Sequence, residues 1–194
     1  MGRRLENLYL GNSAPLSRAN LLCKLWPGEG YSDLKYGYLV REEDLDEVIA
    51  ADSKILRELE LSYDRLAEAI EQLFLSDDDE HKGNLVLRRE FIESPVCPRQ
   101  DYCTVTPFSL SKKVTEIVVV NSDKLDEALT VMERYGDLTL ESLPELTERD
   151  LVMIFSDLHP HLIREQHFLE GYATPYRVDP IRAGRYFGLL GVEL

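Results

Sequence analysis

Between residues 42 and 74 the hydrophobic positions recur every three or four residues, which is the spacing of one face of an α-helix. The pattern forms two stripes, and the second begins after Ser62, a residue type that often caps the start of a helix. We therefore predict two amphipathic helices in this region. Their apolar faces comprise Leu45, Val48, Ile49, Ile55, Leu56 and Leu59 in the first, and Tyr63, Leu66, Ala67, Ile70, Leu73 and Phe74 in the second.

Further along the chain the period shortens to that of β-strands. Residues 114–121 (VTEIVVVN) are β-branched and apolar, and residues 84–93 (NLVLRREFIE) have a similar composition, so both segments are predicted to be strands. Before the two predicted helices, residues 34–40 are predicted as a shorter strand, which Gly37 weakens. Residues 137–143 (DLTLESL) are a candidate return strand.

One helix is predicted between the strand at 114–121 and the candidate strand at 137–143. Ser122 can cap its start, acidic residues follow in its first turn, and Gly136 stands where a glycine commonly ends a helix. The elements together predict an α+β fold, in which a helical N-terminal half packs with a small mixed β-sheet covered by helices. The acidic segment SDDDEHKGN is the best domain boundary, giving an N-terminal strand and helical region at 1–80 and an α/β region at 81–194. A single continuous domain stays open as the alternative.

Composition narrows the class of partner. The chain of 194 residues is 44% hydrophobic and carries a net charge of −14, which disfavours nucleic acid and anionic membranes as partners and leaves a protein partner or self-association. No apolar run reaches the length that crosses a bilayer. The three cysteines are too few for a disulfide scaffold, so we expect a reducing compartment and a cytoplasmic location.

The segment DLVMIFSDLHPHLIREQHF, residues 150–168, contains the clearest candidate metal ligands, Asp157, His159 and His161. An apolar run followed by Asp-x-His resembles the first motif of calcineurin-like metallophosphoesterases. The resemblance implies that a strand delivers a carboxylate and an imidazole to a centre of divalent Zn, Mn or Fe. It covers about five residues, and the further Gly-Asp, Gly-Asn-His and Gly-His-x-His motifs of that family do not follow His161.

The same segment has a purely structural interpretation, which we favour. Residues 151–158 would form a helix, the chain would break before Pro160, and a second helix would run from Pro160 to about Leu169. On that second helix His161 and His167 point to different faces, so the three histidines of the segment cannot all converge on one ion.

Two cysteines offer a second, weaker metal hypothesis. Cys97 and Cys103 could join His159 and His161 in a Cys2His2 zinc set, although their spacing is wider than that of a usual zinc knuckle. The alternative is a pair of buried free thiols in a proline-rich loop.

The C-terminal region 171–191 is locally basic and aromatic in an otherwise acidic chain. Arginine forks bind carboxylate or phosphate and tyrosines provide flat contact area, so the region is a candidate site for an anion or a partner. The alternative is a tail that folds back and pairs its arginines with the protein's own carboxylates. The candidate residues are Arg177, Arg182, Arg185, Tyr176 and Tyr186.

Two functional hypotheses follow. The first is a non-catalytic binding or assembly module, and it is favoured because the chain contains no nucleotide-binding, nucleophile-elbow or zinc-protease motif. The second is a metal-dependent hydrolase that acts on a phosphate or another anion. It would use Asp157, His159 and His161 as ligands and the C-terminal arginines to hold the substrate.

Overall fold

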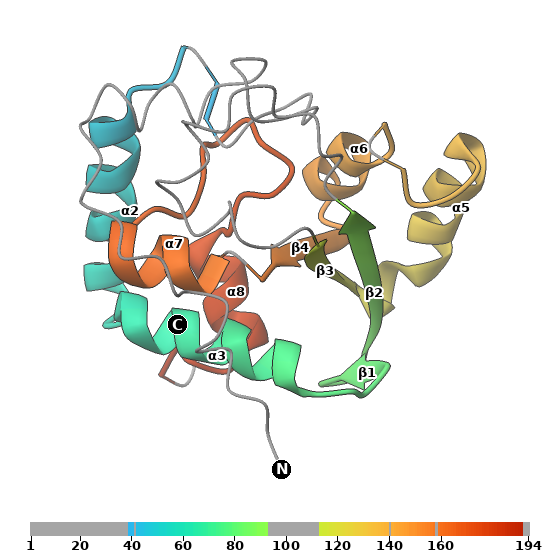
Figure 1. The fold of residues 1–194 in the computed structure, drawn as a ribbon, viewed down its shortest axis with the longest axis horizontal. Coiled ribbons are helices and arrows are strands. Elements are labelled where there is room, and N and C mark those ends of the chain that lie inside the picture. The colour runs from blue at the N-terminus through green and yellow to red at the C-terminus, as the bar shows by residue number, and fades with distance from the viewer. Residues whose placement is uncertain (1–38, 41, 93–112, 140, 158, 192–194) are drawn as a thin grey trace.

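The computed structural model describes residues 39–40, 42–92, 113–139, 141–157 and 159–191, and confirms an α+β fold (Figure 1). None of the helices in this part of the chain has the length and hydrophobicity needed to span a lipid bilayer. The elements are α2 (Leu45–Glu58), α3 (Tyr63–Leu75), β1 (Glu80–His81), β2 (Asn84–Ile92), β3 (Lys113–Val120), the 3-10 helix η3 (Ser122–Lys124), α5 (Leu125–Tyr135), α6 (Leu143–Glu148), β4 (Val152–Ser156), α7 (His159–Gln166) and α8 (Pro180–Tyr186).

The two helices predicted from the N-terminal hydrophobic stripes are confirmed. Asp44 caps α2 by accepting hydrogen bonds from the backbone N–H groups of Asp46 and Glu47, at 2.8 and 3.1 Å. Ser62 caps α3, as its position in the sequence predicts, and accepts from the N–H of Arg65 at 3.2 Å. The predicted apolar faces supply most of the buried residues of both helices.

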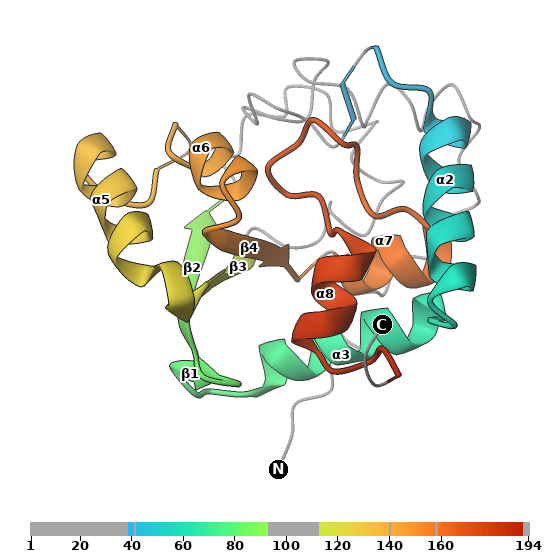
Figure 2. The same ribbon diagram turned by 180° about the vertical axis from the view of Figure 1, so that it is seen from behind.

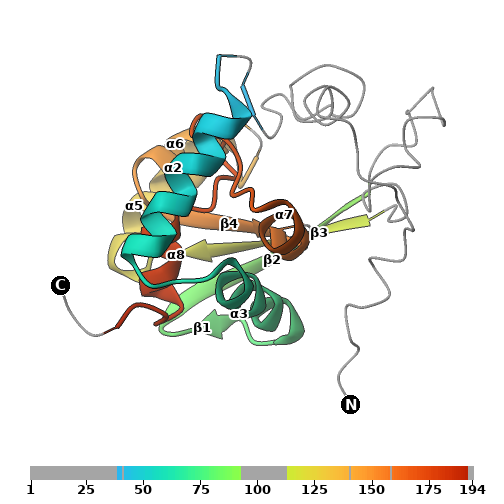
Figure 3. The same ribbon diagram turned by 90° about the vertical axis from the view of Figure 1, so that its left-hand side faces the viewer.

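The strands pair in the order β1-β2-β3-β4, and every pair is antiparallel, so the expectation of a mixed sheet is wrong for this part of the chain. Residue patterns identified β2 and β3 but carry no information on strand direction. The turn at Lys82 and Gly83, both with positive φ, suits a tight hairpin between β1 and β2. Figure 3 shows the four strands in order, with β4 at the edge nearest α2.

Two segments differ from their predictions. Residues 137–139 and 141–143 do not form a strand, because Thr139 and Ser142 close a turn on each other that leads into α6. Residues 151–157 do not form a helix, because Val152–Ser156 pairs along β3 as β4. A short apolar run lacks a period that separates strand from buried helix. The helix expected from Pro160 is confirmed as α7, which begins at His159 and ends at Gln166, before Leu169.

The region from residue 121 to residue 136 follows its prediction closely. The predicted helix is α5, and Gly136 ends it in the left-handed conformation at φ 82°. Its start differs, since η3 precedes it and Asn121 rather than Ser122 provides the cap.

The predicted strand at 34–40 lies outside the described residues except for Leu39 and Val40, which are not in a strand.

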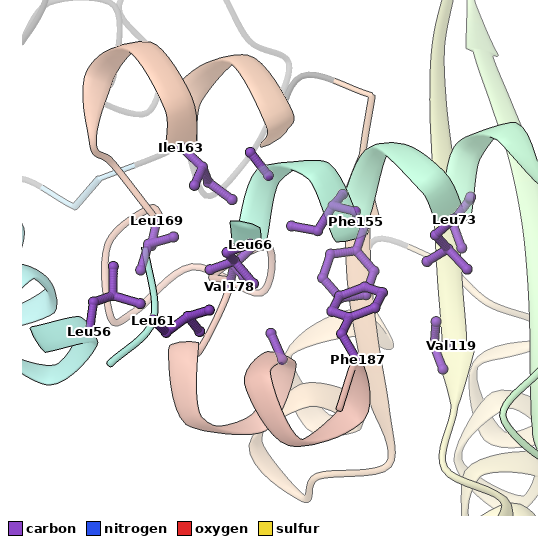
Figure 4. Close-up of a cluster of buried hydrophobic side chains, with 14 of the residues drawn as sticks. Leu56, Leu61, Leu66, Leu73, Val119, Phe155, Ile163, Leu169, Val178 and Phe187 are labelled. Atoms are coloured by element: carbon purple, nitrogen blue, oxygen red, sulfur yellow. The ribbon is translucent and has the colours of Figure 1, made fainter. Parts of the chain in front are cut away.

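Helices cover both faces of the sheet. α3, α7 and α8 bury one face in a cluster that includes Leu66, Phe155 and Phe187, and the rings of Phe155 and Phe187 lie side by side in Figure 4. α5 and α6 bury the other face around Val118, Val152 and other residues. α3 packs on α7 and α8, so contacts cross the predicted boundary at residue 80. The division into regions 1–80 and 81–194 stays a prediction.

Candidate functional site

Among the described strands β4 pairs with β3 alone, so the opposite edge of β4, which we call its free edge, has no described strand beside it. Asp157 N–H donates to the carbonyl of Thr115 at 3.0 Å, and Asn121 N–H donates to that of Leu151 at 2.9 Å. In an antiparallel pair the backbone N–H and C=O groups of successive residues point alternately toward and away from the partner strand. The backbone groups of the odd-numbered residues of β4 therefore point toward β3. The N–H and C=O groups of Val152, Ile154 and Ser156 therefore point away from β3, at the edge of the sheet.

Side chains satisfy the two ends of this edge but not its middle. Arg182 Nη2 donates to the carbonyl of Val152 at 3.1 Å, and Ser156 N–H donates to His159 Nδ1 at 2.9 Å. Between them, neither the N–H nor the C=O of Ile154 has a hydrogen-bond partner in the described part of the chain. Ile154 is only 2% exposed, and buried backbone groups are almost always paired. Ile154 thus presents one donor and one acceptor that a bound molecule can satisfy.

A cavity of about 360 Å³ lies along this edge, and we call it the edge cavity. Four consecutive residues of β4, from Val152 to Phe155, form its floor. Its walls come from the end of α6, from the segment 172–179 and from the start of α8, which Figure 2 shows on the β4 side of the molecule. Ile154, whose backbone groups are unpaired, is therefore one of the residues that line the cavity.

Arg177 lines the edge cavity but is already paired. Its Nη1 donates to Asp52 Oδ2 at 3.2 Å and to the carbonyl of Glu170 at 2.6 Å, and its guanidinium lies 3.9 Å above the ring of Tyr172. Asp52 is 0% exposed on α2. Burial raises the pKa of Asp52, and the guanidinium of Arg177 opposes that rise. Arg177 therefore ties the C-terminal segment to α2.

Arg182 also lines the cavity and is also paired, through Asp150 and the carbonyl of Val152. These pairings are the fold-back arrangement that sequence analysis offered as the alternative to an anion site. Arg185 is exposed on α8, does not line the edge cavity, and makes no side-chain ion pair among the described residues. The three arginines do not converge on one point.

The two tyrosines of the same prediction are elsewhere. Tyr176 is buried against the α5 and α6 face of the sheet, and burial raises its pKa. Tyr186 packs beside Phe187, and its hydroxyl lies 2.6 Å from His81 Nδ1. Burial also raises the pKa of Tyr186. The binding prediction for the C-terminal region is therefore carried forward only by Arg177 and Arg182.

His159, a predicted metal ligand, is fully buried with both ring nitrogens engaged. Because Nδ1 accepts a hydrogen bond from the N–H of Ser156, the proton of the neutral ring lies on Nε2. Nε2 lies 2.7 Å from Glu170 Oε1 and donates to it, and Glu170 Oε2 accepts from the hydroxyl of Thr174. Neither nitrogen offers a free lone pair to a metal in this arrangement.

Within the described residues, Asp157 and His161 do not complete a metal centre. Asp157 follows β4 directly, as the phosphoesterase resemblance implies, and its Oδ2 accepts from the N–H of Thr115 at 3.2 Å. Burial raises the pKa of Asp157 and lowers that of His161. No group of three or more His, Cys, Asp or Glu side chains in the described ranges could hold a metal ion. Cys97 and Cys103 lie outside those ranges, so metal binding stays a prediction.

Hydrogen exchange should reveal the unpaired edge. The amides of Met153 and Phe155 donate to β3, whereas that of Ile154 has no acceptor among the described residues. We expect the Ile154 amide to exchange about tenfold or more faster than both neighbours, measured residue by residue by NMR in deuterated buffer. Equal protection of the three amides would mean that Ile154 already has an acceptor.

Sequence reasoning missed Ile154, Asp52 and Glu170. A backbone orphan depends on which edge of a strand is covered, and no residue type signals that. Comparison with known proteins adds no further guide to the site, because no family model, curated protein or solved structure matches this chain.

Proposed function

We propose that this protein is a non-catalytic binding module and that its ligand occupies the edge cavity. One observation carries the proposal: Ile154 is buried, lines the cavity, and has an N–H and a C=O without a partner in the described chain. An unpaired buried backbone group costs about 1–3 kcal/mol, and a ligand that pairs with both groups regains that free energy.

The charged side chains around the cavity support binding rather than catalysis. Arg177 and Arg182 are held by Asp52 and Asp150, and Asp179 accepts from two N–H groups at the start of α8. Groups fixed in this way position the walls but are not poised to transfer a proton or attack a substrate. The metal-dependent hydrolase stays a prediction that the arrangement around His159 does not favour.

The walls of the cavity are also fixed in advance. Arg177 joins the segment 172–179 to α2, and Arg182 joins α8 to β4. A site whose side chains are already held in place loses less conformational entropy when a ligand binds. The edge cavity therefore has the organisation of a recognition site.

Filling the cavity should remove binding. Ala173 is exposed and lines the edge cavity, so Ala173→Trp places an indole at its mouth without disturbing the core. We expect ligands from a mixed library of short peptides and small amides, detected by ligand-observed NMR, to bind the wild-type protein and to lose at least about tenfold in affinity for this variant.

Leu129→Trp is the matched control, since Leu129 is 44% exposed on α5 and does not line the cavity. This variant should bind as the wild type does, and thermal denaturation should show that both variants are folded. If every ligand of the wild type binds Ala173→Trp equally well, the edge cavity is not the binding site.

A further inference from the structure

We infer that the occupant of the edge cavity is an extended segment of another protein that adds to β4 as a short antiparallel strand and carries a lysine or arginine opposite Ile154. This inference rests on the proposed function and names the class of its ligand. Three features of the described structure carry it: the backbone groups of β4, the length of the free edge, and the charge of the cavity walls.

The backbone groups on the free edge of β4 have the arrangement that a further antiparallel strand can pair with. Ile154 directs both its N–H and its C=O to one side, and a single residue of an antiparallel strand exchanges two hydrogen bonds with such a pair. Val152 directs its N–H to the same side, which offers a third bond to a residue two positions along the added strand. An extended peptide supplies donors and acceptors at this spacing through its backbone alone, whatever its sequence.

The free edge is short. Arg182 occupies the carbonyl of Val152, and His159 occupies the N–H of Ser156, so continuous pairing cannot extend past either residue. At about 3.3 Å per residue, the available edge fits a peptide of roughly five residues. A second copy of this chain is a poor occupant, because each copy carries a net charge of −14 and the two would repel each other.

Charge selects the central side chain. The residue opposite Ile154 projects to the same face of the sheet as Ile154, and α6 covers that face. Glu148 ends α6, is exposed, lines the cavity and makes no ion pair within the described residues. Because Arg177 and Arg182 are already neutralised by Asp52 and Asp150, Glu148 and Asp179 leave the walls negative. A lysine can lay its stem against Ile154 and reach Glu148 with its ammonium group.

The flanking residues of the peptide project to the opposite face. There the cavity is lined by Val178 and Ala183, which are apolar and buried. β-Branched apolar residues on either side of the lysine suit these walls and favour an extended backbone. The test peptide is therefore Ac-Thr-Val-Lys-Val-Thr-NH2 with a fluorescent label.

Fluorescence anisotropy with the full chain tests the inference. We expect the peptide to bind the wild-type protein and Leu129→Trp, and to lose about tenfold or more in affinity for Ala173→Trp. N-methylation of the central lysine removes the donor to the C=O of Ile154 and should also weaken binding about tenfold or more. A peptide with glutamate in place of the lysine should bind more weakly than the lysine peptide, because its carboxylate faces that of Glu148.

Glu148→Gln should weaken binding of the lysine peptide by about two- to fivefold, the scale of an exposed ion pair. Glu141→Gln, the matched control, removes the same charge from an exposed residue that does not line the cavity, and should change nothing. Equal affinity of the N-methylated and unmodified peptides, or equal affinity for Ala173→Trp and the wild type, would overturn strand addition.

The failure of this inference is distinguishable from the failure of the proposed function. If small amides bind in a way that Ala173→Trp abolishes while the lysine peptide does not bind, the peptide class is wrong and the binding module stands. If neither the peptide nor any library member binds in the edge cavity, both proposals are wrong.

Discussion

Replacing Arg177 by methionine should lower the free energy of unfolding by about 3–5 kcal/mol, because it leaves the carboxylate of Asp52 buried without its counter-charge. Asp52 is 0% exposed, and Arg177 also donates to the carbonyl of Glu170 and stacks on Tyr172. The substitution therefore breaks the link between α2 and the C-terminal segment. Equilibrium unfolding in urea, at constant m-value, measures the loss.

The pH dependence of this loss identifies its cause. Burial raises the pKa of Asp52, and without the opposing guanidinium of Arg177 that pKa should rise further. A carboxyl with a raised pKa in the folded state favours folding increasingly as it becomes protonated, so the destabilisation should shrink as the pH is lowered from neutral. Arg185→Met, a matched change at an exposed arginine, should alter stability by less than about 0.5 kcal/mol. A pH-independent loss, or one below about 1 kcal/mol, would contradict a buried ion pair.

Replacing His159 by alanine should cost about 3–5 kcal/mol of stability. The change leaves a cavity beside Phe155, removes the acceptor of the Ser156 N–H, and leaves the buried carboxylate of Glu170 without its imidazole donor. Three losses at one fully buried position add to a large effect. Chemical denaturation of the purified variant, compared with the wild type, measures it.

The matched control is His161→Ala in the same helix, where the side chain is half-buried, and the expected loss is less than about 1 kcal/mol. Elemental mass spectrometry of the same samples separates the structural role of His159 from the predicted metal centre. We expect both variants to contain the same amount of metal as the wild type. Near-stoichiometric zinc, manganese or iron that is lost from both would instead establish the metal site.

Three helices were readable from the sequence. The apolar stripes of α2 and α3 fix the helical period, end signals predict α5, and Ser62 and Gly136 mark ends that the structure confirms. β4 was misassigned because its apolar run is short, and only pairing with β3 decides its conformation. Strand direction was unreadable for the same reason, since it depends on contacts made far away in the sequence.

The site was readable only in part. The basic C-terminal segment pointed to Arg177 and Arg182, and both line the edge cavity. Their carboxylate partners could not be predicted individually, because Asp52 lies 125 residues before Arg177. Ile154 carries no chemical signal at all, since its significance comes from two backbone groups that the end of a sheet leaves uncovered. The sequence shows side chains, whereas this candidate site depends on the main chain.

An NMR titration of ¹⁵N-labelled protein with Ac-Thr-Val-Lys-Val-Thr-NH2 tests directly whether a peptide binds at the free edge of β4. We expect the amide resonance of Ile154 to shift more than those of Met153 and Phe155, and its hydrogen exchange to slow as the peptide saturates the protein. In Ala173→Trp these changes should be absent at the same peptide concentration. Shifts confined to other surfaces, with the Ile154 amide unchanged in position and exchange rate, would contradict a binding site at the free edge of β4.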